Sequence, residues 1–259
     1  MTKKPFQTAL FNVVEKPIIV DGLEVPSRKA IVRVDNGNVL SIVSNKYVPV
    51  DNAKVLETFT QIAEEAKVEW RPGDAYFVHG GVKTTMEIIF PQHVFEPKKG
   101  DIAEMRAWLT NGFSGSAAKL EMGFFRFICS NGAILGRKDM CIRYIHMGKV
   151  KERLAEEFKL YLGSRLGEAK HLAETLTHGN FDSQEQVRAI IEKTQVVGSK
   201  MKREVTAEWE KQQKSLSAWI LYNVFTYVLS HVVKGNIERR MWQMKQLTNE
   251  ATKWAAYRG

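Results

Sequence analysis

The sequence predicts an α+β protein, with a mainly antiparallel sheet in the N-terminal half and long helices in the C-terminal half. Before about residue 150, short β-branched runs alternate with Gly, Asn and Pro turn signals. After that point, apolar residues recur every three or four positions, as along one face of a helix. No Gly- or Ser-rich linker separates residues 1–150 from 151–259. One continuous domain with oligomer contacts therefore stands as an alternative to two regions.

The sheet elements are read from turn chemistry. Asn36-Gly37 between two β-branched runs is a strong hairpin signal, and Gly80-Gly81 is a second one. We leave open whether 105–110 is a strand or a helix. The other elements expected here are a hairpin of 28–34 and 39–44, a helix capped by Asn52 and reaching about Ala66, a turn at 71–74, a hairpin of 75–79 and 83–90, a loop over 91–100, a turn at 111–116, and strands over 119–129 and 140–147.

The helical region is expected to hold four helices. They are one long amphipathic helix over about 154–176, a helix capped by Asp182 or Ser183 and continuing through Gly198 towards Trp209, an apolar helix over 215–233, and a basic helix over 237–257. The third is apolar on most sides, so we expect either a central helix or part of an oligomer interface. We favour a homo-oligomer.

The sequence carries no recognisable catalytic motif. The histidines are scattered without metal-ligand spacing, and phosphate-binding Gly motifs are absent. The run from Gly112 to Ser116 lacks the final Gly of a nucleophile elbow. Cys129 sits in an apolar run and fits a buried, inert thiol. We therefore expect a protein that is not an enzyme, with no catalytic residue, metal or cofactor.

The N-terminus lacks the apolar region of a signal peptide, and no run of 18 apolar residues occurs. Only two cysteines are present, which fits a reducing compartment. We expect a cytoplasmic protein without membrane contact.

Positive charge is concentrated in one segment. The net charge is +9, and residues 119–153 alone carry five more positive than negative charges, interleaved with aromatic rings. Single-stranded nucleic acid is bound by cations that neutralise phosphates and by rings on which bases stack. The candidate phosphate contacts are Lys119, Arg126, Arg137, Lys138, Arg143 and Lys149, and the candidate stacking platforms are Phe125, Phe127 and Tyr144. Taken alone, the phenylalanines fit a protein core better, whereas the cations as a group fit a polyanion contact better.

The last helix forms a second basic cluster, accompanied by Trp242, Trp254 and Tyr257. It fits either a further nucleic-acid contact or a surface whose Trp and Met side chains bury against a partner subunit.

Two segments carry a resemblance. Residues 33–50 read RVDNGNVLSIVSNKYVPV, and residues 111–135 read NGFSGSAAKLEMGFFRFICSNGAIL. Together they resemble the phage/plasmid-like family of unknown function, whose members share a Y-x-P-v-x-N opening and an N-x-x-D-G-S-x-A…R-x-x-C-x-N centre. The positions that fit the centre are Asn111, Gly115, Ser116, Ala118, Arg126, Cys129 and Asn131, with Ser114 where the family usually shows Asp.

The resemblance implies a role in phage DNA metabolism, in the cytoplasm of a bacterial host. Within the family, the chain is most similar to single-stranded-DNA-binding proteins of podoviruses that package a giant virion RNA polymerase. It implies largely sequence-independent binding of single-stranded DNA in replication and middle transcription, with a phage RNA polymerase as a further partner. The alternatives are a single-strand annealing protein of recombination and a protein that recruits or inhibits a host enzyme.

Overall fold

The computed structural model describes residues 2–115, 118–126, 142–144, 164, 167, 170–232 and 237–254. Its contacts divide the chain into two compact units. The first holds Met1–Gln92 and Arg106–Met122 together with residues 142–144, and the second holds His93–Met105 and the helices after residue 170. The predicted boundary at residue 150 lies outside the described residues and stays a prediction.

The α+β class is confirmed. The described elements are β1 (Thr2–Pro5), η1 (Phe6–Ala9), β2 (Val13–Val20), β3 (Leu23–Arg33), β4 (Val39–Ser44), α1 (Asn52–Glu65), β5 (Arg71–Val78), η2 (His79–Gly81), β6 (Lys83–Lys98), β7 (Asp101–Gly112), β8 (Ala118–Arg126), β9 (Ile142–Tyr144), α3 (Gln184–Lys193), α4 (Ser199–Lys211), α5 (Ala218–Tyr227), η3 (Val228–Val232) and α6 (Ile237–Trp254). The strands form a six-stranded sheet in the order β1-β5-β6-β7-β8-β9 and a three-stranded sheet in the order β2-β3-β4.

Both predicted hairpins are confirmed. β3 pairs antiparallel with β4, and Gly37 in the turn between them takes a φ of 72°, which Gly adopts without steric cost. β5 pairs antiparallel with β6 across the Gly80-Gly81 turn. The undecided segment 105–110 is part of β7 and therefore a strand.

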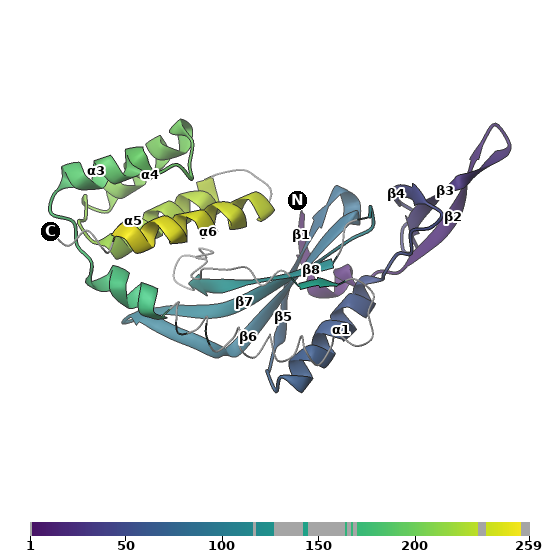
Figure 1. The fold of residues 1–259 in the computed structure, drawn as a ribbon, viewed down its shortest axis with the longest axis horizontal. Helices are drawn as coiled ribbons and strands as arrows, with labels where there is room; N and C mark the ends of the chain where they lie inside the picture. Colours follow the sequence, from purple (N-terminus) through teal and green to yellow (C-terminus); the bar gives the residue numbers. More distant parts are fainter. Residues whose placement is uncertain are drawn as a thin grey trace. The chain divides into compact units, whose positions relative to one another are not determined.

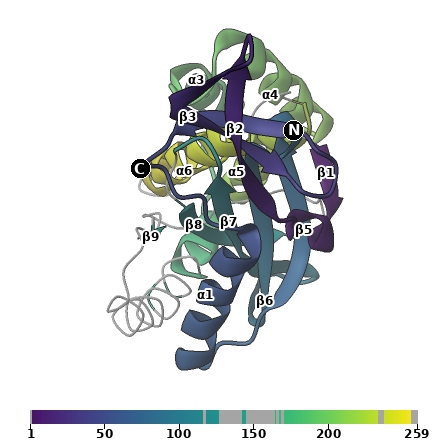
Figure 2. The ribbon, with the colours of Figure 1, turned by 90° about the vertical axis from the view of Figure 1, so that its right-hand side faces the viewer.

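α1 covers one face of the larger sheet and builds the core of the first unit (Figure 1 and Figure 2). Its apolar stripe includes Val55, Phe59 and Ile62, all buried. The Phe59 ring lies 5.5 Å from the Trp70 ring and 6.4 Å from the Phe90 ring of β6, measured between centroids. The three-residue and four-residue spacing of this stripe is why residues 52–65 form a helix on a sheet.

Three sequence expectations in the first half were wrong. The segment 71–74 is the start of β5 rather than a turn. Pro72 and Gly73 are part of the strand, and the pairing of β5 with β6 shifts register between Pro72 and Ala75. The segment 91–100 is not a loop, since β6 continues to Lys98. The turn that follows contains Gly100, which has a φ of 82°. Asn52 does not cap α1, because its side chain is buried in contacts described below and Asp51 takes the cap position.

The helices of the second unit pack as neighbouring pairs. The Phe225 and Trp254 rings of α5 and α6 lie 5.6 Å apart, and the Tyr222 and Thr248 hydroxyls lie 2.9 Å apart. Ser183 caps α3 as one of the two expected residues, since its Oγ accepts from Gln186 N–H at 3.2 Å. The sequence predicted that this helix would continue through Gly198, and that prediction was wrong. α3 ends at Lys193, and α4 starts after Gly198.

The hairpin of β2 and β3 extends beyond the third strand. β4 pairs with β3 only as far as Arg28, whereas β2 and β3 stay paired up to Val20 and Leu23. Residues 17–27 therefore form a two-stranded arm that projects from its sheet (Figure 1). Asp21 and Gly22 make its turn, both at positive φ. Neither β1 nor β2 was expected from the sequence, although Asp21-Gly22 between apolar runs is a hairpin signal.

Candidate functional site

The structure brings two of the sequence-predicted site residues into direct register. In the antiparallel pair of β8 and β9, Lys119 is the partner of Arg143, and Ala118 is the partner of Tyr144. Ala118 and Leu120 are buried, at 7% and 0% exposure, while Lys119 between them is partly exposed. The face of the pair that carries Lys119 is thus the more accessible one, and the register places position 143 on that same face.

The other predicted residues are less closely placed. Phe125 and Arg126 are the last two residues of β8. Tyr144 takes the register position opposite Ala118. Four further candidates, Phe127, Arg137, Lys138 and Lys149, lie outside the described residues, as does Cys129.

Two like charges in direct cross-strand register are unusual. Directly opposite residues have Cβ atoms about 4.5–5.5 Å apart, and like charges at such positions are unfavourable for a sheet. Lys and Arg side chains both donate charge-assisted hydrogen bonds to phosphate oxygens. The arrangement is chemically suited to hold a phosphate group.

A buried polar network fixes the end of β7, from which the chain enters β8. The side-chain amide of Asn111 donates to the Val50 carbonyl at 2.8 Å and to Asn52 Oδ1 at 2.9 Å. The Asn52 amide in turn donates to the Ala9 carbonyl at 2.7 Å. Asn52 is fully buried and Asn111 is 4% exposed, so these bonds replace those with water.

Two hydroxyl groups complete this network around the same turn. Tyr47 Oη donates to the Gly112 carbonyl at 3.1 Å, and Ser41 Oγ donates to the Phe113 carbonyl. Burial raises the pKa of the Tyr47 hydroxyl, which keeps it protonated as a donor. The segment 41–52 thereby holds residues 111–113, and the two sequence segments that carry the family resemblance meet here. Sequence reasoning did not assign them to each other, although their joint presence in one family pattern was an available signal.

Arg33 ties the hairpin turn of β3 and β4 to the turn of β5 and β6. Its guanidinium binds both carboxylate oxygens of Asp35, at 2.9 and 2.5 Å, and donates to the Gly80 carbonyl at 2.9 Å. The same group lies over the Phe11 ring. Hydrogen bonding from Arg33 lowers the pKa of Asp35. A Cβ at Gly81 would lie 3.1 Å from both the guanidinium and the Phe11 ring, so only Gly fits this turn without displacement.

A buried ion pair crosses the larger sheet. Glu87 in β6 accepts from Arg106 in β7 at 2.9 Å and from the Asp74 N–H in β5 at 3.1 Å. The Glu87 side chain is 4% exposed. A Cβ at Gly73 would lie 2.5 Å from Glu87 Oε2, so the strand needs Gly there to admit the carboxylate. The pair joins three strands through a buried carboxylate, which makes it a structural feature.

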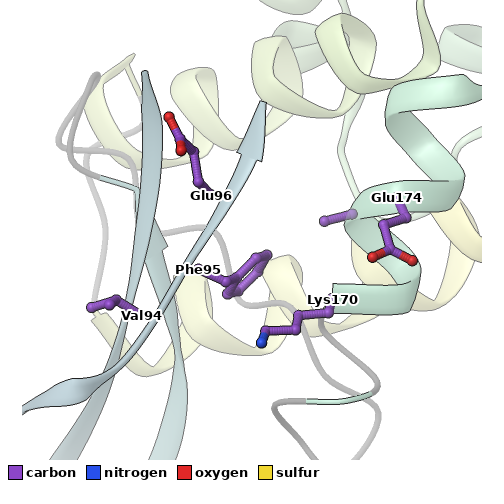
Figure 3. A pocket seen from close by; sticks show the side chains of 6 residues that line it. Val94, Phe95, Glu96, Lys170 and Glu174 are labelled. Atoms are coloured by element: carbon purple, nitrogen blue, oxygen red, sulfur yellow. The ribbon is translucent and has the colours of Figure 1, made fainter. Parts of the chain in front are cut away.

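The second unit contains a shallow pocket of about 330 Å³ (Figure 3). Val94, Phe95 and Glu96 of β6 line one side, and Lys170, Ala173 and Glu174 of the helical segment 170–178 line the other. The pocket combines one phenyl ring, one ammonium group and two carboxylates. It holds neither a nucleophile with an adjacent base nor a hydroxyl, thiol or imidazole group.

Within the part of the chain that the structure describes, no three His, Cys, Asp or Glu side chains come together as a metal site. None of the described helices combines the length and apolarity that a membrane crossing needs.

Comparison with known proteins identifies a family. The family model described as a domain of unknown function (DUF932) matches residues 39–257. The chain belongs to this family. The matched range contains the network of Tyr47, Asn52 and Asn111 as well as β8 and β9, whereas the arm of residues 17–27 precedes it. No curated protein and no solved structure matches the chain.

Proposed function

We propose that this chain binds single-stranded DNA, largely without regard to sequence, and that it does so without catalysing a reaction. The direct register of Lys119 and Arg143 carries the proposal, because it creates a paired cationic position on the accessible face of two strands. The net charge of +9 adds a general attraction to polyanions.

The surrounding structure supports this role for the β8–β9 pair. The buried network at Asn111 and the hydroxyls of Ser41 and Tyr47 hold the chain just before β8 begins. Phe125, at the end of β8, and Phe127 and Tyr144 are the proposed stacking residues, each base stacked contributing about 1–3 kcal/mol.

The finer proposal places the protein in phage DNA metabolism. Membership of the DUF932 family does not name an activity, so the similarity to podovirus single-stranded-DNA-binding proteins enters here as a proposal. In that role the protein would coat melted DNA during replication and help a phage RNA polymerase onto middle promoters, in the host cytoplasm.

Fluorescence-anisotropy titration tests the proposal. The full chain is titrated against labelled oligothymidine, a duplex of the same length and the corresponding RNA, at low and at physiological salt. We expect the tightest binding to the single DNA strand, with affinity that falls steeply as salt rises. Absent binding, or equal binding to all three polymers, would contradict the proposal. A parallel assay with complementary oligonucleotides distinguishes simple coating from strand annealing.

A further inference from the structure

The arm of residues 17–27 differs in chemistry from the rest of the chain. Its apolar side chains are exposed at the tip: Ile19 by 64%, Val20 by 55% and Leu23 by 75%. Asp21 and Glu24 are its charged residues, so the arm is acidic, while the chain as a whole carries +9. A hairpin of only two strands is marginally stable in water. Exposed apolar side chains gathered at its tip indicate a surface that another molecule covers.

An acidic, apolar tip has a defined complement. It is repelled by nucleic-acid phosphates, which excludes the arm from the proposed DNA contact. It is attracted to a basic surface that also offers an apolar anchor. A second copy of this strongly basic chain is such a surface.

α6 offers the matching patch. Trp242 is 58% exposed and is the largest of the exposed apolar side chains in the described residues. Arg239, also exposed, lies three residues earlier and is therefore its neighbour on the helix surface. Trp254 and Met244 of the same helix are buried at 6% and 4%, so Trp242 is left over from the packing of its own unit. Trp and Arg are the residues that most often dominate binding at protein interfaces.

We infer that the arm of one copy docks on the Trp242–Arg239 patch of a second copy. Ile19 and Leu23 pack against the Trp242 indole, and Asp21 and Glu24 face the Arg239 guanidinium. The two surfaces are different, so the contact joins copies either reciprocally in a symmetric pair or head to tail in rings or filaments. This inference does not rest on DNA binding, because it is tested in the absence of nucleic acid.

Sedimentation velocity of the full chain tests the contact with two surface variants. Ile19→Thr with Leu23→Thr removes the apolar tip, and Trp242→Ser with Arg239→Gln removes the patch. We expect oligomers for the wild type and monomers for both variants, with association weakened at least tenfold. Ile42→Thr with Val48→Thr is the matched control, because these side chains are 61% and 66% exposed outside the arm, and it should still associate.

Mixing the two variants gives the sharpest test. The patch variant keeps an intact arm and the arm variant keeps an intact patch, so the mixture should form a one-to-one heterodimer and nothing larger. Thermal melting of each variant by circular dichroism should match the wild type, since every substituted side chain is exposed. A monomeric wild type, an arm or patch variant that still associates, or a mixture that stays monomeric would overturn the inference.

Discussion

The guanidinium carbon of Arg33 lies 3.8 Å from the centre of the Phe11 ring. The same guanidinium also binds Asp35 and the Gly80 carbonyl, so one side chain connects two turns of the first unit. Lysine cannot reproduce this planar arrangement.

We expect Arg33→Lys to lower the free energy of unfolding by about 2 kcal/mol. Most of this loss comes from the ring contact and the bond to the Gly80 carbonyl, because Asp35 is half exposed and its ion pair therefore contributes little. Urea denaturation measures the change. Arg28→Lys, an exposed position of the same strand, should change stability by under about 0.5 kcal/mol.

The Arg33–Asp35 pair also predicts a pH dependence. Hydrogen bonding from Arg33 lowers the pKa of Asp35 below its ordinary value of 3.8. A carboxyl group whose pKa is lower in the folded protein stabilises the fold above its unfolded pKa, and this contribution disappears as pH falls through the folded value. Asp35→Asn should therefore be less stable than the wild type at pH 7, with the difference shrinking below about pH 4. A constant difference between pH 7 and pH 2 would contradict the assignment.

The buried amides predict a coupled effect. Asn111→Ala leaves the Val50 carbonyl and Asn52 Oδ1 without their donor, and we expect a loss of about 2–3 kcal/mol in urea denaturation. Asn52→Ala should cost a similar amount, and the double variant should cost less than the two single losses together. Asn12→Ala, an exposed position, is the control and should be near neutral. Strict additivity of the two buried changes would show that the network is not a unit.

The Glu87–Arg106 pair predicts an asymmetry between single and double replacement. Arg106→Met leaves the buried Glu87 carboxylate without its partner cation, which should cost about 3–5 kcal/mol. Glu87→Leu with Arg106→Met removes both charges, and the double variant should be more stable than Arg106→Met alone. Thermal unfolding compares the three proteins. If the double variant is the least stable of the three, the prediction is wrong, and the ion pair stabilises the fold beyond the neutralisation of a buried carboxylate.

Local turn chemistry was sufficient to predict much of the fold. Asn36-Gly37 and Gly80-Gly81 fixed the two hairpins, and the three-to-four spacing in 55–62 fixed α1. Pro91 and Pro97 were misread as loop signals, because a long strand tolerates proline where its N–H is not needed by a neighbour. β1 was missed because its partner, β5, is distant in sequence, whereas β2 was missed although the Asp21-Gly22 turn that joins it to β3 is a local hairpin signal.

The candidate site was predicted only in part. Charge and residue type singled out Lys119 and Arg143, but their direct opposition follows from the register of β8 and β9, which no local pattern specifies. Asn52 was expected to cap a helix, since Asn is a common cap. Instead, its side-chain oxygen accepts a hydrogen bond from Asn111, which is 59 residues away in the sequence.

The proposed DNA contact is tested by the salt dependence of single-stranded DNA binding in a variant with Lys119→Gln and Arg143→Gln. The matched control is Lys200→Gln with Arg203→Gln, which removes the same charges from exposed positions of α4. We expect the β8–β9 variant to bind oligothymidine at least tenfold more weakly. The slope of log affinity against log salt should also fall by about 1.4, since each lost phosphate contact accounts for about 0.7. Equal affinities and equal slopes for the two variants would contradict the claim that Lys119 and Arg143 hold the DNA backbone.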